Sequence, residues 1–96
     1  MNVYEKLTAG IEEVMTSTKY KSKNTRRIDL CNRYNSAIAC VLASENLTES
    51  GRLRILGAKG LLTKTIVDAA DDEELKLYID YFVKPVLYDF FAKVEI

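Results

Sequence analysis

The scarcity of turn-forming residues constrains this chain more than any other feature. Its 96 residues include one proline and four glycines. These residues form the tight turns that a β-rich domain needs at short intervals, so a chain with so few of them is better suited to helices. Because 48% of the residues are apolar and 29% are charged, the composition is that of a globular domain with a buried core. We therefore expect residues 1–96 to form a single all-α domain.

Apolar periodicity and helix caps place the first two helices. The first is expected over 3–16, with Asn2 as its N-cap. The second is expected from about residue 24 to near residue 45, and a buried strand over 37–43 is the alternative for part of it. The predicted core face of the second helix consists of Ile28, Cys31, Tyr34, Ile38, Val41 and Leu42.

A third helix is expected over 49–69, with Thr48 as its N-cap and an interruption near its glycines. This segment has two apolar faces rather than one. Leu53, Leu56, Gly60 and Val67 lie on the first, and Ile55, Leu62, Ile66 and Ala69 lie on the second.

The last helix is expected to start in the acidic run 71–74, where carboxylates oppose the positive end of the helix dipole. Pro85 removes a backbone donor and clashes with the preceding turn, so it should kink or split this helix. The predicted core face is Leu75, Tyr78, Ile79, Phe82, Val83 and Val86 before the proline, and Val86, Leu87, Phe90 and Val94 after it. The pattern thus predicts a rotation of about a quarter turn at Pro85. The expected fold is a four-helix bundle.

A second apolar stripe on the last helix indicates an interface with another protein. Its members recur on the side opposite the predicted core face, and they are Leu77, Tyr81, Tyr88 and Phe91. Aromatic residues, tyrosine above all, are enriched in the centres of interfaces. We expect this stripe to pack against a second copy of the chain. A different protein partner, or complete burial inside the bundle, are the alternatives.

The charges of the chain are unevenly distributed. Residues 1–67 carry 11 Lys and Arg against 6 Asp and Glu, for +5, and residues 68–96 carry 3 against 8, for −5. The candidate electrostatic or phosphate-binding residues are Lys19, Lys21, Lys23, Arg26, Arg27, Arg33 and Lys59. Pairing of this basic arm with the acidic end of the same chain is the favoured interpretation. Nucleic-acid phosphates or an acidic protein surface are the alternatives.

The run Ile55-Leu56-Gly57-Ala58-Lys59-Gly60, followed by Ile66, is similar to the G-x-x-G loop of KH domains. In that family the glycines let backbone amides approach nucleic-acid phosphates. A KH fold also requires strands on both sides of the loop, and no alternating segment follows residue 67. Glycines three residues apart on a closely packed helix explain Gly57 and Gly60 equally well.

Few residues suggest catalysis, a cofactor or a metal site. The chain has no histidine, the usual general base and zinc ligand. Cys31 and Cys40 are nine residues apart on one predicted helix, too far along the axis to form a disulfide, which suits a reducing compartment. The charged start of the chain has no secretory signal, and the longest apolar run, 37–43, has seven residues, too few to cross a membrane. We expect a cytoplasmic protein that is not an enzyme and needs no cofactor or metal.

The sequence therefore predicts a small regulatory, adaptor or inhibitor protein that acts through protein–protein contact, as a homo-oligomer. A nucleic-acid-binding module that uses the basic 19–33 arm is the alternative.

Overall fold

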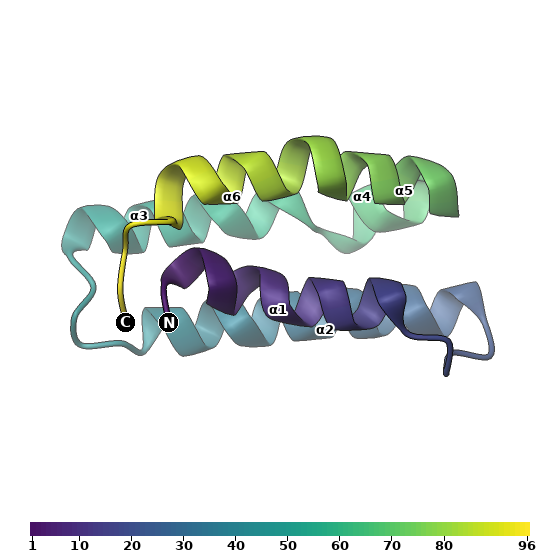
Figure 1. Ribbon diagram of the computed structural model, residues 1–96, viewed down its shortest axis with the longest axis horizontal. Coiled ribbons are helices and arrows are strands. Elements are labelled where there is room, and N and C mark those ends of the chain that lie inside the picture. Colours follow the sequence, from purple (N-terminus) through teal and green to yellow (C-terminus); the bar gives the residue numbers. More distant parts are fainter.

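The computed structural model describes all 96 residues as an antiparallel four-helix bundle of 39 × 22 × 20 Å (Figure 1). The first two helices are α1 (Val3–Thr16) and α2 (Lys23–Leu42). The third arm comprises α3 (Glu49–Ala58), a 3-10 turn η1 (Lys59–Leu61) and the short α4 (Lys64–Ala69). The fourth comprises α5 (Asp72–Tyr78), a π-helical turn η2 (Ile79–Val83) and α6 (Lys84–Phe91). This architecture confirms the predicted all-α bundle.

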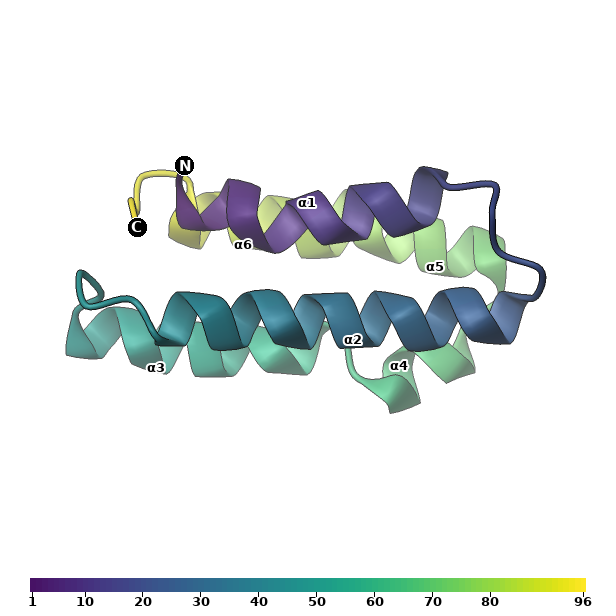
Figure 2. The same cartoon turned by 90° about the horizontal axis from the view of Figure 1, so that it is seen from below.

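The most extensive packing between helices joins α1 to α2, and each of these two helices has further neighbours. Figure 2 shows α1 alongside α5 and α6, and α2 alongside α3 and α4. The two chain ends meet at one end of the bundle, where the amide N–H of Val3 donates to the carbonyl oxygen of Val94 at 2.7 Å. A single β-bridge between Asn2 and Glu95 is the only extended pairing. None of the helices has the length and apolar character needed to cross a membrane.

Polar side chains cap the N-termini of the helices, largely as the sequence predicts. Asn2 accepts from the amide N–H of Glu5 at 2.7 Å, and Thr48 accepts from Gly51 at 3.0 Å. The second helix begins at Lys23 because Ser22 accepts from the amide of Thr25, so its start precedes the expected one by one or two residues. Each cap satisfies an amide that has no partner within its own helix.

The C-termini of the helices are closed by side chains from other helices. No residue has a positive φ, so no helix ends in the left-handed glycine conformation that commonly closes helices. Arg26 of α2 donates to the carbonyl oxygens of Met15 and Ser17 at 3.1 and 2.9 Å, and Arg52 of α3 donates to that of Ser44 at 3.1 Å. These contacts join successive helices and satisfy carbonyl groups that would otherwise lack a partner.

The same type of contact is found at two further helix ends. The buried hydroxyl of Tyr34 donates to the carbonyl oxygen of Ala58 at 2.7 Å, which ties α2 to the end of α3. The side-chain amide of Asn2 donates to the carbonyl oxygen of Ala92 at 2.9 Å, which ties the start of α1 to the end of α6.

The core confirms most of the predicted face of α2 and corrects its first turn. Tyr34, Ile38 and Val41 are buried as expected, but the buried residue of the first half of the helix is Leu30, and Ile28 is half exposed. Residue 30 is aligned with 34 and 38 at successive i, i+4 steps, whereas residue 28 is about 160° away from residue 30 around the helix. The prediction for Ile28 was therefore wrong.

The last helix is split at Pro85 as predicted, but its core face does not rotate there. A single row faces the core along its whole length, and this row consists of Leu75, Ile79, Val83, Leu87 and Phe91. In an uninterrupted α-helix a row with a spacing of four would drift sideways by about 40° per step. The wide turn η2, in which the amide of Lys84 donates to the carbonyl of Ile79, reduces that drift just before the proline.

The third arm is interrupted as predicted, between Leu61 and Lys64. Gly57 lies in α3 and Gly60 in η1, and no strand flanks either glycine. The likeness to a KH loop therefore does not extend to the fold. A Cβ atom built on either glycine would meet nothing within 4 Å, so close packing inside the chain does not explain them.

Candidate protein-binding surface

Three residues of the predicted stripe form an exposed apolar ridge on α5, η2 and α6. The exposed fractions are 50% for Leu77, 77% for Tyr81 and 59% for Tyr88. We call these three residues the aromatic ridge. The prediction that Phe91 belongs to the same surface was wrong, because Phe91 ends the core row described above and is only 3% exposed.

The charged neighbours of the ridge are drawn towards α1. Lys84 forms ion pairs with Glu12 of α1 and with Asp80, the latter at 3.1 Å. On the same side, the ring of Tyr88 packs edge-on against Tyr4 with 5.3 Å between centroids. The ridge therefore has a structured, charge-compensated flank towards α1, and its exposed rings project from a well-packed helix.

An apolar groove runs between α3 and α6 on the other flank of the last helix. It has a volume of about 260 Å³, and we call it the α3–α6 groove; its lining is Arg54, Gly57, Ala58, Leu61, Val86, Leu87, Phe90 and Phe91. Gly57 leaves one wall without a side chain, and half-exposed Phe90 forms the facing wall. The guanidinium carbon of Arg54 lies 5.7 Å from the centroid of the Phe90 ring, a cation–π distance.

Further exposed apolar residues lie on the same two arms. Leu53 and Leu56 of α3 are 65% and 50% exposed, and Phe82 of η2 is 48% exposed. Phe82 stacks on Tyr78 at 5.4 Å, and the hydroxyl of Tyr78 donates to the carbonyl oxygen of Leu61, which ties the end of α5 to η1. Sequence reasoning assigned Leu53 and Leu56 to an apolar face without identifying it as a surface. The two apolar faces of the third helix were the available signal.

Most arginines of the basic arm form contacts within the chain. The guanidinium of Arg26 closes α1 and lies 5.3 Å from the ring of Tyr20. Arg33 pairs with Glu13 at 2.9 Å, and this contact raises the pKa of the guanidinium. The hydroxyl of Tyr20 donates to Asp29, which raises the pKa of the phenol. These cations lie in separate intramolecular contacts rather than on one phosphate-binding surface.

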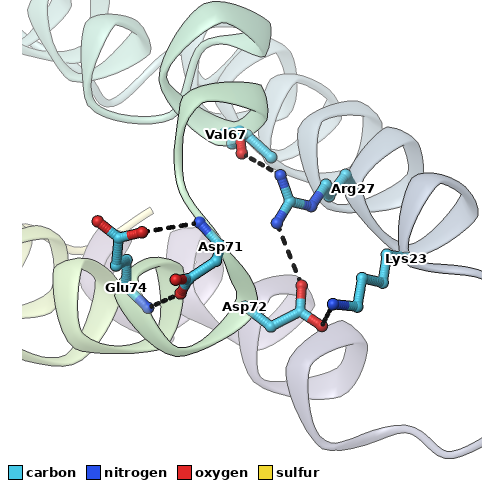
Figure 3. Close-up of polar contacts among 6 residues, drawn as sticks. All are labelled: Lys23, Arg27, Val67, Asp71, Asp72 and Glu74. Carbon is cyan, nitrogen blue, oxygen red and sulfur yellow. Dashed lines mark hydrogen bonds and ion pairs between the residues drawn. The ribbon is translucent and has the colours of Figure 1, made fainter.

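Arg27 joins the basic arm to the acidic end of the chain. It donates to the carbonyl oxygen of Val67 at 2.7 Å and to the carboxylate of Asp72 at 3.1 Å, and Lys23 lies 3.7 Å from the same carboxylate (Figure 3). The favoured interpretation of the charge asymmetry, pairing within the chain, is thus confirmed at this point. Of the other predicted cations, Lys19 lies over the ring of Tyr20, and Lys21 and Lys59 are exposed and make no ion pair.

Three of the four carboxylates in the acidic run have a structural role. Asp71 accepts from the amide of Glu74 at 2.8 Å, the Glu74 carboxylate accepts from the amide of Asp71, and Asp72 pairs with Arg27 (Figure 3). The donated amide hydrogen lowers the pKa of Asp71. Glu73 is exposed and makes no hydrogen bond or ion pair with another side chain, so its carboxylate is free.

The remaining chemically active side chains do not assemble into a centre. Cys31 and Cys40 are free thiols, and burial raises the pKa of Cys31. No group of three or more Cys, Asp or Glu residues is placed to hold a metal ion. Comparison of the chain with protein-family models, with curated proteins and with solved structures finds no match. The function must therefore be inferred from the chain's own residues. The aromatic ridge and the adjoining groove are the candidate binding surfaces, because they leave apolar side chains exposed to water.

Proposed function

We propose that this protein is a small non-enzymatic regulatory or adaptor protein that acts by binding other protein chains through the aromatic ridge, and that it self-associates. The observation that carries this proposal is Tyr81, which is the most exposed large apolar side chain of the protein and stands in the middle of the ridge. A tyrosine in that position offers a rigid apolar surface with a polar tip, the combination favoured in interface centres.

The amount of exposed apolar surface supports a protein ligand rather than a small molecule. Tyr81, Phe82, Tyr88 and Phe90 are between 48% and 77% exposed. At about 150–250 Å² for each whole side chain, they leave roughly 350–600 Å² in water before the leucines are added. One partner contributes about 800 Å² to a standard protein interface. The groove volume of about 260 Å³ is below the ~300–1,000 Å³ usual for small-molecule pockets.

The nucleic-acid alternative has weaker physical support. Phosphate binding requires cations that are free to replace the condensed counterions, and Arg26, Arg27 and Arg33 already donate within the fold. The two unpaired cysteines suit a reducing compartment, so the cytoplasm is the proposed location.

A photo-cross-linking experiment tests the proposal. A benzoylphenylalanine residue replaces Tyr81 in the source cell, and in a matched control it replaces Thr65, an exposed residue of α4. We expect position 81 to yield discrete protein cross-links, to a second copy or to another protein, and position 65 to yield none of them. If irradiation at position 81 captures no more protein than at position 65, or captures mainly nucleic acid, the proposed function is wrong.

A further inference from the structure

The α3–α6 groove combines an apolar wall with an uncompensated positive charge. No carboxylate lies within ion-pairing distance of Arg54, whose guanidinium sits over the Phe90 ring. Gly57 is a poorer helix former than alanine, and no contact inside the chain requires it. The ligand that matches this groove places an apolar side chain opposite Gly57 and a carboxylate beside Arg54.

The chain itself carries such a segment. Glu73 and Leu77 are four residues apart on α5, so they lie on one face of the helix. Leu77 is half exposed, and Glu73 is the carboxylate of the acidic run that has no structural role. Tyr81 continues the same row by one more step of four residues.

The spacing of these groups matches a two-fold axis at Tyr81. Leu77 precedes Tyr81 by four residues and Val86, in the groove wall, follows it by five; at about 1.5 Å per residue these intervals are about 6 and 7.5 Å. Glu73 precedes Tyr81 by eight residues, or about 12 Å, and Phe90 follows it by nine, or about 13.5 Å. The guanidinium of Arg54 lies over the ring of Phe90. Rotation about an axis at Tyr81 therefore brings Leu77 of one copy to about the height of Val86 of the other along the helix axis, and Glu73 to about the height of Phe90.

We propose that two copies of the chain pack with their last helices antiparallel about a two-fold axis at Tyr81, so that Leu77 of each copy fills the α3–α6 groove of the other and Glu73 pairs with Arg54. Such an interface is isologous, because the same patch serves on both sides. It uses the exposed apolar area estimated above, and it pairs the acidic α5 with the basic α3. This inference rests on the proposed function, since it identifies the partner of the aromatic ridge as a second copy.

A charge-exchange experiment on the full chain tests the arrangement. The mass in solution is measured by light scattering and sedimentation equilibrium, from low to high micromolar concentration, for the wild type, Arg54→Glu, Glu73→Arg and an equimolar mixture of the two variants. Each single variant brings two like-charged contacts into the symmetric dimer, so we expect self-association at least tenfold weaker than wild type. In the mixture both contacts join opposite charges again, and the two-chain mass should return with near wild-type affinity.

Two controls separate the interface from the fold. Lys59→Glu makes the same charge change in the neighbouring turn η1 and should keep wild-type self-association. At low protein concentration, circular dichroism should show the same helical content for every variant, and thermal unfolding should be little changed for Arg54→Glu and Lys59→Glu, because Arg54 and Lys59 are exposed and make no ion pair within the chain. Glu73→Arg puts a cation in the first turn of α5 and should lower the melting temperature slightly.

Three outcomes would overturn the proposed dimer: a one-chain mass for the wild type at every concentration, a two-chain mass that neither variant weakens, or weakened variants whose mixture does not recover. A one-chain mass together with cross-links from position 81 to a different protein would refute the dimer and the self-association, and it would leave standing the proposal that the aromatic ridge binds other protein chains. The absence of protein cross-links from that position would refute both.

Discussion

The two sides of the bundle use glycine in opposite ways. On the α1–α2 side, a Cβ atom built on Gly10 would lie 3.3 Å from the Cβ of Arg33, so the missing side chain lets the two helices approach closely. On the α3–α6 side, a Cβ built on Gly57 would meet no atom within 4 Å. The first glycine is explained by the fold, and the second leaves an open groove between helices.

The same contrast holds for charge and apolar surface. Between α1 and α2, Arg33 pairs with Glu13 and Arg26 closes the end of α1, so polar groups are used to hold the pair together. On the other side, exposed Leu53 and Phe90 flank an unpaired Arg54. The charged groups between α1 and α2 are thus paired within the chain, whereas the α3–α6 side leaves apolar side chains in water and Arg54 without a carboxylate.

Matched leucine substitutions should give the largest difference between the two sides. Leu7 of α1 is 0% exposed and Leu53 of α3 is 65% exposed. Leu7→Ala should lower the free energy of unfolding by about 2–5 kcal/mol, because it leaves a cavity in the core. Leu53→Ala should change it by less than about 0.5 kcal/mol. Urea unfolding at low protein concentration measures both, and similar losses for the two variants would contradict the division of the bundle.

Removing one hydroxyl tests the hydrogen bond between Tyr34 of α2 and the end of α3. Tyr34→Phe leaves the buried carbonyl of Ala58 without its donor, which should cost about 1–3 kcal/mol. Tyr81→Phe removes an exposed hydroxyl instead and should cost much less. The free energy of unfolding of both variants is measured by urea denaturation at neutral pH, and equal losses would show that the buried bond contributes nothing.

The same variant changes the response to alkaline pH. Burial raises the pKa of Tyr34 well above its ordinary value of about 10. Below the ordinary pKa of about 10, Tyr34 keeps its phenolic proton in both the folded and the unfolded chain, so its contribution to stability is fully present. Above that pKa the unfolded chain loses the proton first, and the free energy of unfolding falls as pH rises. Tyr34→Phe should weaken this fall without abolishing it, because the pKa values of Tyr20 and Tyr78 are raised too. An unchanged slope between pH 9 and 11 would contradict this role.

The features that the sequence predicts well are local. Asn2 and Thr48 cap helices because each carries a short oxygen acceptor next to an amphipathic run, and the structure confirms both predictions. The last helix starts in the acidic run 71–74 as predicted, and Asp71 is the residue that caps it. Leu77 and Tyr81 were identified as a surface because their spacing repeats along a single helix. Such patterns depend on near neighbours in the chain, so they can be recognised from the sequence alone.

The features that the sequence misses depend on backbone geometry and on distant segments. Phe91 faces the core because the π-helical turn η2, which directly precedes α6, shifts the phase of the last helix, and the apolar pattern does not reveal such a turn. The α3–α6 groove combines Gly57 with Phe90, residues from two arms whose relative rotation is fixed by the whole bundle. The partners of the basic arm also depend on the tertiary structure, since Arg27 donates to Val67 and Asp72 on other helices.

The two glycines supply the smallest and most specific test of the comparison. Gly57→Ala should raise the stability of the single chain by about 1 kcal/mol, because alanine is the better helix former and its methyl group meets no neighbour. Gly10→Ala gains the same helix propensity, but its methyl group presses on the Cβ of Arg33, which α2 holds in place; we expect no net gain.

Self-association should respond in the reverse order. Gly57→Ala puts a methyl group in the wall that we propose receives Leu77 of the partner, so a more stable chain should form a weaker dimer. Gly10→Ala lies on the α1–α2 side and should leave self-association unchanged. Thermal unfolding at low concentration and the mass at high concentration separate the two effects. If Gly57→Ala strengthens both the fold and the dimer, the groove receives nothing at that position, and the open glycine requires another explanation.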